Sequence, residues 1–186
     1  MWVTAGAGLP AKRLEMLKLA VPNAKRVGFI RSTSLSSSGV ENVLAAAHAH
    51  GVTLSMVIVD GTADLEAAFA EISRNRTDAI WCADNTANFG SRARLIEFAA
   101  RERLPALYAF RQFTESGGLM SYGVNIREID SRIALYIDKI LKGAKPGDLP
   151  IEQPTSLELV INLKTARALG LAMPQELLLS AQQVIE

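Results

Sequence analysis

Four short apolar segments recur at nearly equal intervals along the first part of the chain. Their centres, Val27, Leu54, Ile80 and Leu107, lie 27, 26 and 27 residues apart. This interval accommodates a strand, a crossover helix and two short loops, the repeating unit of a parallel sheet. The segments are apolar throughout rather than alternating, which is typical of strands covered on both faces. We therefore predict an α/β fold in three layers, α/β/α, around a doubly wound parallel sheet.

The segments between these strands place apolar residues at helical spacing, so each predicts an amphipathic helix. These helices are expected at about 11–21, in the stretch ending at Gly51, around 65–72 and around 95–99. The pattern changes after Gly117-Gly118, where the expected elements are a strand at 119–123, a helix at about 128–141, a turn segment at 143–150, a strand at 157–162 and two short helices at 163–169 and 174–185. Asn162 is the expected N-cap of the first short helix.

Composition narrows the function classes. The 186 residues include 20 Lys+Arg and 19 Asp+Glu, and the length predicts one domain or one domain with an appendage. A formal net charge of +1 supplies no basic field for a phosphate backbone, so we expect no nucleic-acid partner. No run of 18 apolar residues predicts a membrane span, and the first residues lack the basic and apolar regions of a signal peptide.

The sequence shows no combination of side chains that is typical of a catalytic site. The single cysteine, Cys82, lies inside an apolar strand, where a small buried hydrophobe is the expected role. His48 and His50 fall on the polar side of a predicted helix and are expected to be solvated. The sequence has no phosphate-binding loop and no cluster with metal-ligand spacing. We therefore expect no enzyme, and no catalytic residue, cofactor or metal.

Polar loops follow the predicted strands, and ligands of open parallel sheets bind outside the carboxyl ends of strands. After the first strand, Ser32, Thr33 and Ser34 run toward a helix start, where hydroxyls and free N–H groups suit a carboxylate. The alternative is that these side chains only cap the helix and keep the loop solvated.

Two further loops offer candidate ligand contacts. Asp84 and Asn85 follow the third strand, where they suit a ligand ammonium group or, alternatively, an Asx-turn or helix N-cap. Phe110 and Arg111 follow the fourth strand and offer an aromatic wall and a planar donor. Arg111 is equally consistent with a surface arginine lying over Phe113.

Several motifs along the chain are distinctive. They are Lys12-Arg13-Leu14-Glu15-Met16-Leu17, Pro22-Asn23-Ala24-Lys25-Arg26-Val27, Asp84-Asn85-Thr86, Gly117-Gly118-Leu119-Met120-Ser121-Tyr122-Gly123, the stretch 139–154 and the stretch 158–166. Together these motifs resemble the solute-binding proteins of ABC importers, in the branch that includes tryptophan- and tyrosine-binding proteins. The resemblance covers the chain from about Leu9 onward and is most specific in the C-terminal part.

This resemblance implies a type I periplasmic-binding-protein fold, in which two Rossmann-like lobes close over a small ligand by a hinge motion. It implies that Ser32, Thr33 and Ser34 receive a ligand carboxylate, that Asp84 and Asn85 face an ammonium group, and that Phe110 and Tyr122 line the pocket. The implied function is binding of a small, amino-acid-like solute, with an ABC permease as partner. The implied location of the full-length parent is periplasmic or lipid-anchored outside the cytoplasm.

Members of the resembled family are about twice the length of one lobe. Residues 1–126 are therefore expected to form the C-terminal-type ligand-binding lobe, and 127–186 a crossover helix and a segment returning from an N-terminal lobe that this chain lacks. The helix carrying Ile133, Tyr136, Ile137 and Ile140 would then expose an apolar stripe and favour a homodimer. The alternative function is a stand-alone ligand sensor that reuses one lobe, recognised by a fused signalling domain rather than neighbouring permease and ATPase genes.

Overall fold

The computed structural model describes residues 8–150 and 156–186. Their strands form one seven-stranded sheet in the order β2-β1-β3-β4-β5-β6-β7. The first five strands are mutually parallel, as the equal spacing of apolar segments predicts. They are β1 (Arg26–Arg31), β2 (Thr53–Ile58), β3 (Ala79–Cys82), β4 (Ala106–Tyr108) and β5 (Met120–Val124).

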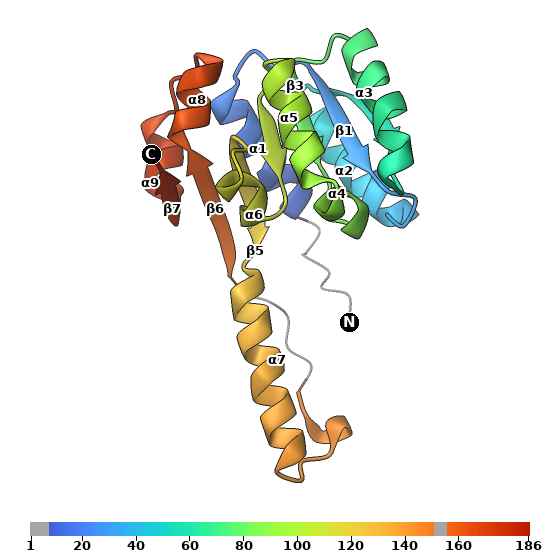
Figure 1. Cartoon of the computed structure of the whole chain (residues 1–186), viewed down its shortest axis with the longest axis vertical. Helices are drawn as coiled ribbons and strands as arrows, with labels where there is room; N and C mark the ends of the chain where they lie inside the picture. The colour runs from blue at the N-terminus through green and yellow to red at the C-terminus, as the bar shows by residue number, and fades with distance from the viewer. Residues whose placement is uncertain (1–7, 151–155) are drawn as a thin grey trace.

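Helices cover both faces of the sheet, so the three-layer α/β/α prediction is confirmed (Figure 1). One face packs against α1 (Leu9–Ala20), α2 (Ser37–Ala49) and α9 (Gln175–Ser180), with Trp81 and Phe29 at its centre. The other face packs against α3 (Leu65–Arg74), α5 (Arg92–Arg101) and α6 (Arg111–Glu115). The central strands β3 and β4 and the middle of β1 are buried on both faces and are apolar there, whereas the edge strand β2 is only partly buried.

Local chemistry sets where the helices begin and end. Ser36 caps α2 by accepting a hydrogen bond at Oγ from the Gly39 N–H, at 3.2 Å. Gly51 follows the same helix with φ +63°, a left-handed conformation that glycine adopts without steric cost. Three short elements were not predicted from the pattern: α4 (Thr86–Gly90), α6, and the 3₁₀ turn at Thr62–Asp64. Each is five residues or shorter, too short to produce a periodic signal.

The C-terminal part returns to the same sheet. β6 (Leu157–Asn162) pairs antiparallel with β5 through five residue pairs, from Met120↔Ile161 to Val124↔Leu157. Asn162 caps α8 (Leu163–Leu169) by accepting from the Thr165 N–H at 3.1 Å, as predicted.

The prediction of a helix over 174–185 is wrong in its second half. α9 ends at Ser180, and β7 (Gln183–Ile185) then pairs in parallel with β6. Pairing supplies the backbone hydrogen bonds that the edge of β6 would otherwise lack. The Gln182 side chain strengthens this connection, because its Oε1 accepts from the Leu159 N–H at 2.6 Å.

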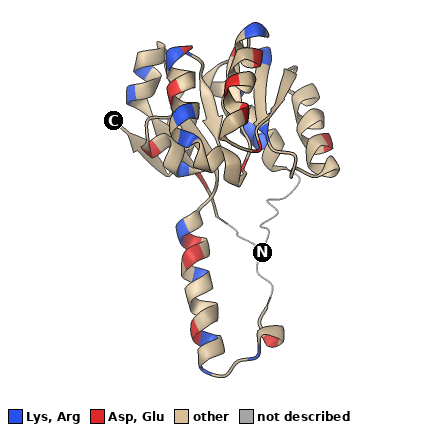
Figure 2. Ribbon diagram, turned by 45° about the vertical axis from the view of Figure 1, so that its right-hand side comes forward, with Lys and Arg blue, Asp and Glu red and all other residues tan. Residues whose placement is uncertain are grey.

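Between β5 and β6 the chain leaves the sheet. Residues 126–150, which we call the arm, comprise α7 (Ile126–Leu141) and a turn containing the 3₁₀ segment Pro146–Asp148. Figure 1 shows the arm projecting away from the sheet and its helices. No side chain of α7 is buried, and acidic and basic residues are interspersed along it (Figure 2).

α7 begins at the expected boundary between residues 126 and 127. The expected second unit, residues 127–186, does not stay together as one unit. Residues 156–186 lie in the same sheet as the first unit because β6 bonds to β5, and the arm alone projects. Residues 151–155 of the family-like stretch, and the N-terminal residues 1–7, are outside the described ranges. Within those ranges, no helix combines the length and apolar character needed to cross a membrane.

Candidate ligand-binding site

The strand order creates a crevice at the carboxyl ends of β1 and β3. These strands are neighbours, but the chain leaves β1 for α2 on one face and leaves β3 for α5 on the other. The two following loops therefore diverge, which is the topological switch point where open α/β sheets bind ligands.

A cavity of about 620 Å³ lies at this switch point. Its polar lining consists of Ser32, Ser34, Asp60, Asp84, Asn85, Thr86 and Gln112. Its apolar lining includes Phe89, Phe110 and Ile126, and the first two rings meet edge to face with centroids 5.7 Å apart. Among the described residues, the lining includes the carboxylates of Asp60 and Asp84 and no lysine or arginine.

Hydrogen bonds fix the position of the loop after β3 beside the cavity. Asn85 caps α4, since its Oδ1 accepts from the Asn88 N–H at 2.8 Å. Asn88 is 1% exposed, and its Nδ2 donates to the carbonyls of Ile30 at 3.1 Å and Ala83 at 2.9 Å. One buried amide therefore joins the ends of β1 and β3. Asn85 both caps a helix and lines the cavity, so the two interpretations of this residue are compatible.

Two buried polar atoms of the lining have no partner in the described part of the chain. They are Nδ2 of Asn85, a donor, and Oε1 of Gln112, an acceptor. Buried polar groups are nearly always hydrogen-bonded, because an unmade bond costs about 1–3 kcal/mol. Both atoms belong to residues that line the cavity, although the atoms themselves are buried.

The loop after β1 differs from a free anion site. The backbone N–H and hydroxyl of Thr33 donate to Asp60 at 2.8 and 2.9 Å, and Thr33 does not line the cavity. Ser32 and Ser34 do line it, with their hydroxyls hydrogen-bonded to each other. Reception of a ligand carboxylate by these three residues stays a prediction, and the adjacent Asp60 opposes it. Sequence reasoning missed Asp60, although its position after the second strand was a usable signal.

Asp84 faces the cavity with its side chain 41% exposed, while its Oδ1 accepts from Arg13 Nη1 at 3.2 Å. Arg13 Nε donates to the Tyr122 carbonyl oxygen at 2.9 Å. Tyr122 does not line this cavity, so its expected role as a pocket wall stays a prediction. Arg13 was missed because a single arginine on a predicted helix gives no sequence signal of burial.

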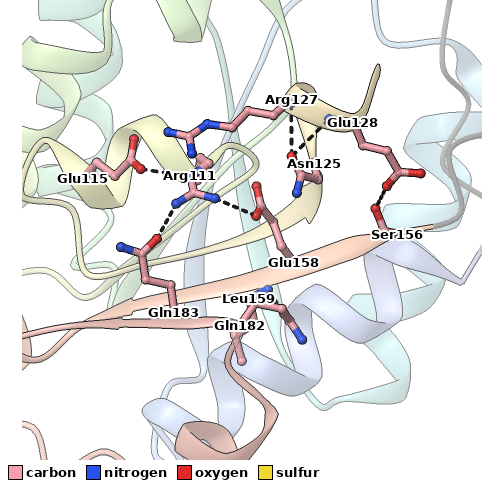
Figure 3. Close-up of polar contacts among 10 residues, drawn as sticks. All are labelled: Arg111, Glu115, Asn125, Arg127, Glu128, Ser156, Glu158, Leu159, Gln182 and Gln183. Atoms are coloured by element: carbon pink, nitrogen blue, oxygen red, sulfur yellow. Dashed lines mark hydrogen bonds and ion pairs between the residues drawn. The ribbon is translucent and has the colours of Figure 1, made fainter. Parts of the chain in front are cut away.

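Arg111 makes contacts that neither interpretation of it anticipated. It does not line the cavity; its Nε donates to Glu115 at 2.9 Å and its Nη1 to Glu158 at 3.0 Å, and its Nη2 donates to Gln183 (Figure 3). The guanidinium thus joins α6, β6 and β7 and neutralises the buried Glu158. A contact with ligand would require Arg111 to leave these partners, and it is not a surface side chain.

The remaining reactive side chains are inert or dispersed. Burial raises the pKa of the Cys82 thiol far above its usual value, so the thiolate nucleophile is not populated at neutral pH. His48 is exposed on α2. Among residues 8–150 and 156–186, no three His, Cys, Asp or Glu side chains are grouped as a metal site.

Comparison with known proteins agrees with this architecture. Residues 7–185 match the family model of the ABC transporter substrate-binding proteins. The chain therefore belongs to that family, a solute-binding rather than an enzymatic class. The resemblance to ABC-importer solute-binding proteins, inferred from the sequence motifs, is therefore confirmed.

Two solved structures and one sequence relative support the same assignment. An ABC domain from Streptococcus pneumonia in complex with L-Trp is 28% identical, with a TM-score of 0.84 over 95% of this chain and 62% of that one. A conserved domain protein from Vibrio cholerae is 25% identical, with a TM-score of 0.85 over 95% and 60% of the two chains. A tyrosine-binding protein of Clostridioides difficile (strain R20291) is 21% identical over 164 residues, 86% of this chain and 47% of the relative. The chain thus spans about half to three fifths of these relatives.

Proposed function

We propose that this chain forms one wall of the ligand cleft of an ABC importer's solute-binding protein, and that the ligand is amino-acid-like. The observation that carries the proposal is the cavity at the switch point, which combines two carboxylates with an aromatic wall. The resemblance to proteins named for L-Trp and tyrosine supports an aromatic amino acid as the first ligand to test.

The cavity suggests how such a ligand would be oriented. Its ammonium group would lie by Asp60 and by Asp84, whose Oδ1 is already paired with Arg13. Phe89 and Phe110 would contact the apolar side chain. The hydroxyls of Ser32 and Ser34 would serve the carboxylate, with the nearby Asp60 weakening this contact.

A second lobe would complete the cleft. The relatives extend well beyond the region that this chain covers, and closure of two lobes by a hinge would bury the ligand from both sides. In that assembly the partner is an ABC permease and the location is outside the cytoplasm. The exposed apolar residues of α7 would lie toward the second lobe.

The proposal is tested by titrating ¹⁵N-labelled chain with L-tryptophan, L-tyrosine and the other amino acids while following backbone amide shifts. One wall alone binds weakly, so we expect dissociation constants of about 1 mM or higher, equivalent to about −4 kcal/mol or weaker. Saturable shifts should appear at Ser32, Asn85 and Phe110. N-acetyl-L-tryptophan, which lacks the ammonium group, should give none. If no amino acid shifts these amides, or if the acetylated probe binds equally well, the proposed function is wrong.

A further inference from the structure

Arg13 is a charged side chain held inside the protein beside the cavity. Arg13 belongs to α1, and its inward-facing neighbours on this helix, Leu14 and Leu17, are apolar. Only 4% of Arg13 is exposed. An unpaired buried charge is strongly destabilising, so its partners define its position. These partners are the Asp84 carboxylate and the Tyr122 carbonyl oxygen, at 3.2 and 2.9 Å.

The two partners of Arg13 belong to different parts of the sheet's carboxyl edge. Asp84 follows β3 and Tyr122 lies in β5, with β4 between these strands in the sheet. The guanidinium therefore spans the carboxyl edge of three strands, with donors at fixed angles that an ammonium group cannot reproduce. It connects the loop that lines the cavity to the strand from which the arm leaves.

Gly123 makes this close approach feasible. A Cβ atom at position 123 would lie 2.1 Å from the Ala109 carbonyl oxygen and 3.2 Å from Arg13 Nη2. The first distance is a severe clash with backbone, so a side chain here would push β5 away from the end of β4. The close packing around Arg13 therefore also depends on glycine at position 123.

Asp84 is engaged by Arg13 through only one of its two oxygens. Oδ2 accepts no hydrogen bond from any residue in the described part of the chain, while the carboxylate borders the cavity. Fixing one oxygen inside the protein sets the direction of the other. Such preorganisation lowers the entropy lost when a ligand binds.

We propose that Arg13 is a positioning residue for ligand binding: it holds Asp84 Oδ1 so that Oδ2 faces the ligand's ammonium group, and it ties this loop to β5. This role rests on the proposed function. A purely structural ion pair would affect the free energy of unfolding alone, whereas a positioning residue also affects loop order and ligand affinity.

The test compares wild type with Arg13→Gln, Arg13→Lys and the matched control Arg26→Gln. Arg26 pairs with Asp78 at 3.4 Å, at the opposite, amino end of the strands, so its loss removes an ion pair without touching the cavity. Each protein is titrated with L-tryptophan, and backbone order parameters are measured by ¹⁵N relaxation without ligand. Arg13→Gln should weaken binding at least tenfold and lower the order parameters of Asn85 and Thr86 from about 0.85 toward 0.6.

Arg13→Lys should give an intermediate loss of affinity and loop order, because lysine keeps the charge but cannot donate along both fixed directions. If Arg13→Gln does not fold, Arg13→Lys serves as the test variant. Arg26→Gln should match wild type in both measurements. Binding of L-tryptophan by Arg13→Gln within twofold of wild type would overturn the positioning role and leave the proposed function intact. If wild type binds no amino acid, the proposed function fails separately, and order parameters unchanged by Arg13→Gln would then refute the role of Arg13 as well.

Discussion

Asp78 illustrates how a single carboxylate depends on its immediate donors. Burial alone would raise its pKa, but hydrogen bonds from the backbone N–H groups of Lys25 and Arg26, at 2.9 and 2.8 Å, and from the Arg26 guanidinium outweigh burial and lower the pKa. The carboxylate therefore joins the chain before β1 to the residue before β3. It is the charged form that stabilises the fold.

The sign of the pH dependence follows from this lowered pKa. The stabilisation by Asp78 is complete above the unfolded-state pKa of about 3.9 and is lost as the pH falls through the lower folded-state pKa. We predict that Asp78→Asn lowers the free energy of unfolding by about 1 kcal/mol between pH 5 and 8. Urea unfolding from pH 2 to 8 measures the difference, which should shrink below about pH 4. A difference that stays constant down to pH 2 would contradict this explanation.

Buried residues also mark the limit of what the sequence predicts at this scale. Cys82 was expected to be a small buried side chain inside an apolar strand. It is buried, because β3 is covered on both faces. Arg13 and Arg111 were unpredictable in detail. Each owes its burial to a carboxylate 71 or 47 residues away, and pairing at such separations leaves no local pattern.

At the scale of elements, the repeated strand and helix units were predictable because burial on both faces imposes a long and regular signal. The short α4 and α6 were not, and neither was the end of α9. Gln183–Ile185 form a strand because β6 offers them an open edge, a tertiary effect that overrides local helical spacing. The site was predictable to the level of its loops, since topology places the residues that follow the parallel strands, such as Ser32 and Asp84, at one edge. Asp60 follows the second strand and was predictable by the same rule, whereas Gln112 became evident only in three dimensions.

Asn88 connects elements in a way that mutation can test. Its side chain satisfies two buried carbonyls, at the ends of β1 and β3. We predict that Asn88→Ala lowers the free energy of unfolding by about 2 kcal/mol, because two hydrogen bonds in a buried position are lost. The Ile30 carbonyl keeps the Ala83 N–H as a donor, so the Ala83 carbonyl carries most of this cost. Denaturant unfolding should show this loss. The control Asn42→Ala, at an exposed position of α2, should change stability by less than about 0.5 kcal/mol. Equal effects of the two substitutions would refute the bridging role.

At the scale of the whole molecule, the arm leaves large apolar side chains in solvent. Ile133, Ile137 and Ile140 are 44%, 52% and 40% exposed and follow one face of α7. Exposed apolar patches promote association when nothing covers them. We expect the isolated chain to form a homodimer through this face, with mass measured by light scattering across concentrations.

A matched pair of variants tests the proposed dimer. Ile137→Glu should shift the chain toward monomer because it places a charge within the apolar face of α7. Leu44→Glu, which removes a similarly exposed apolar residue from α2, should leave the association unchanged. A monomer at every concentration of wild type would contradict the prediction, as would an equal response to both variants.

The antiparallel pairing of β5 with β6 makes the arm a replaceable module. Val124 and Leu157 are directly paired, so the excursion that separates them begins and ends at one point of the sheet. α7 contributes no buried side chain to the core. Replacing residues 125–156 by Asn-Gly would convert the pair into a hairpin, and each halving of a flexible loop lowers its closure cost by about 0.6 kcal/mol.

We predict that this shortened chain folds with wild-type secondary structure and a midpoint temperature at least equal to that of wild type, as measured by circular dichroism. A shortened chain that cannot fold would show that the arm is needed to form the sheet. If it folds, the same position accepts an insertion of another sequence. The seven-stranded sheet would then serve as a frame into which a reporter or a different partner-binding helix can be grafted.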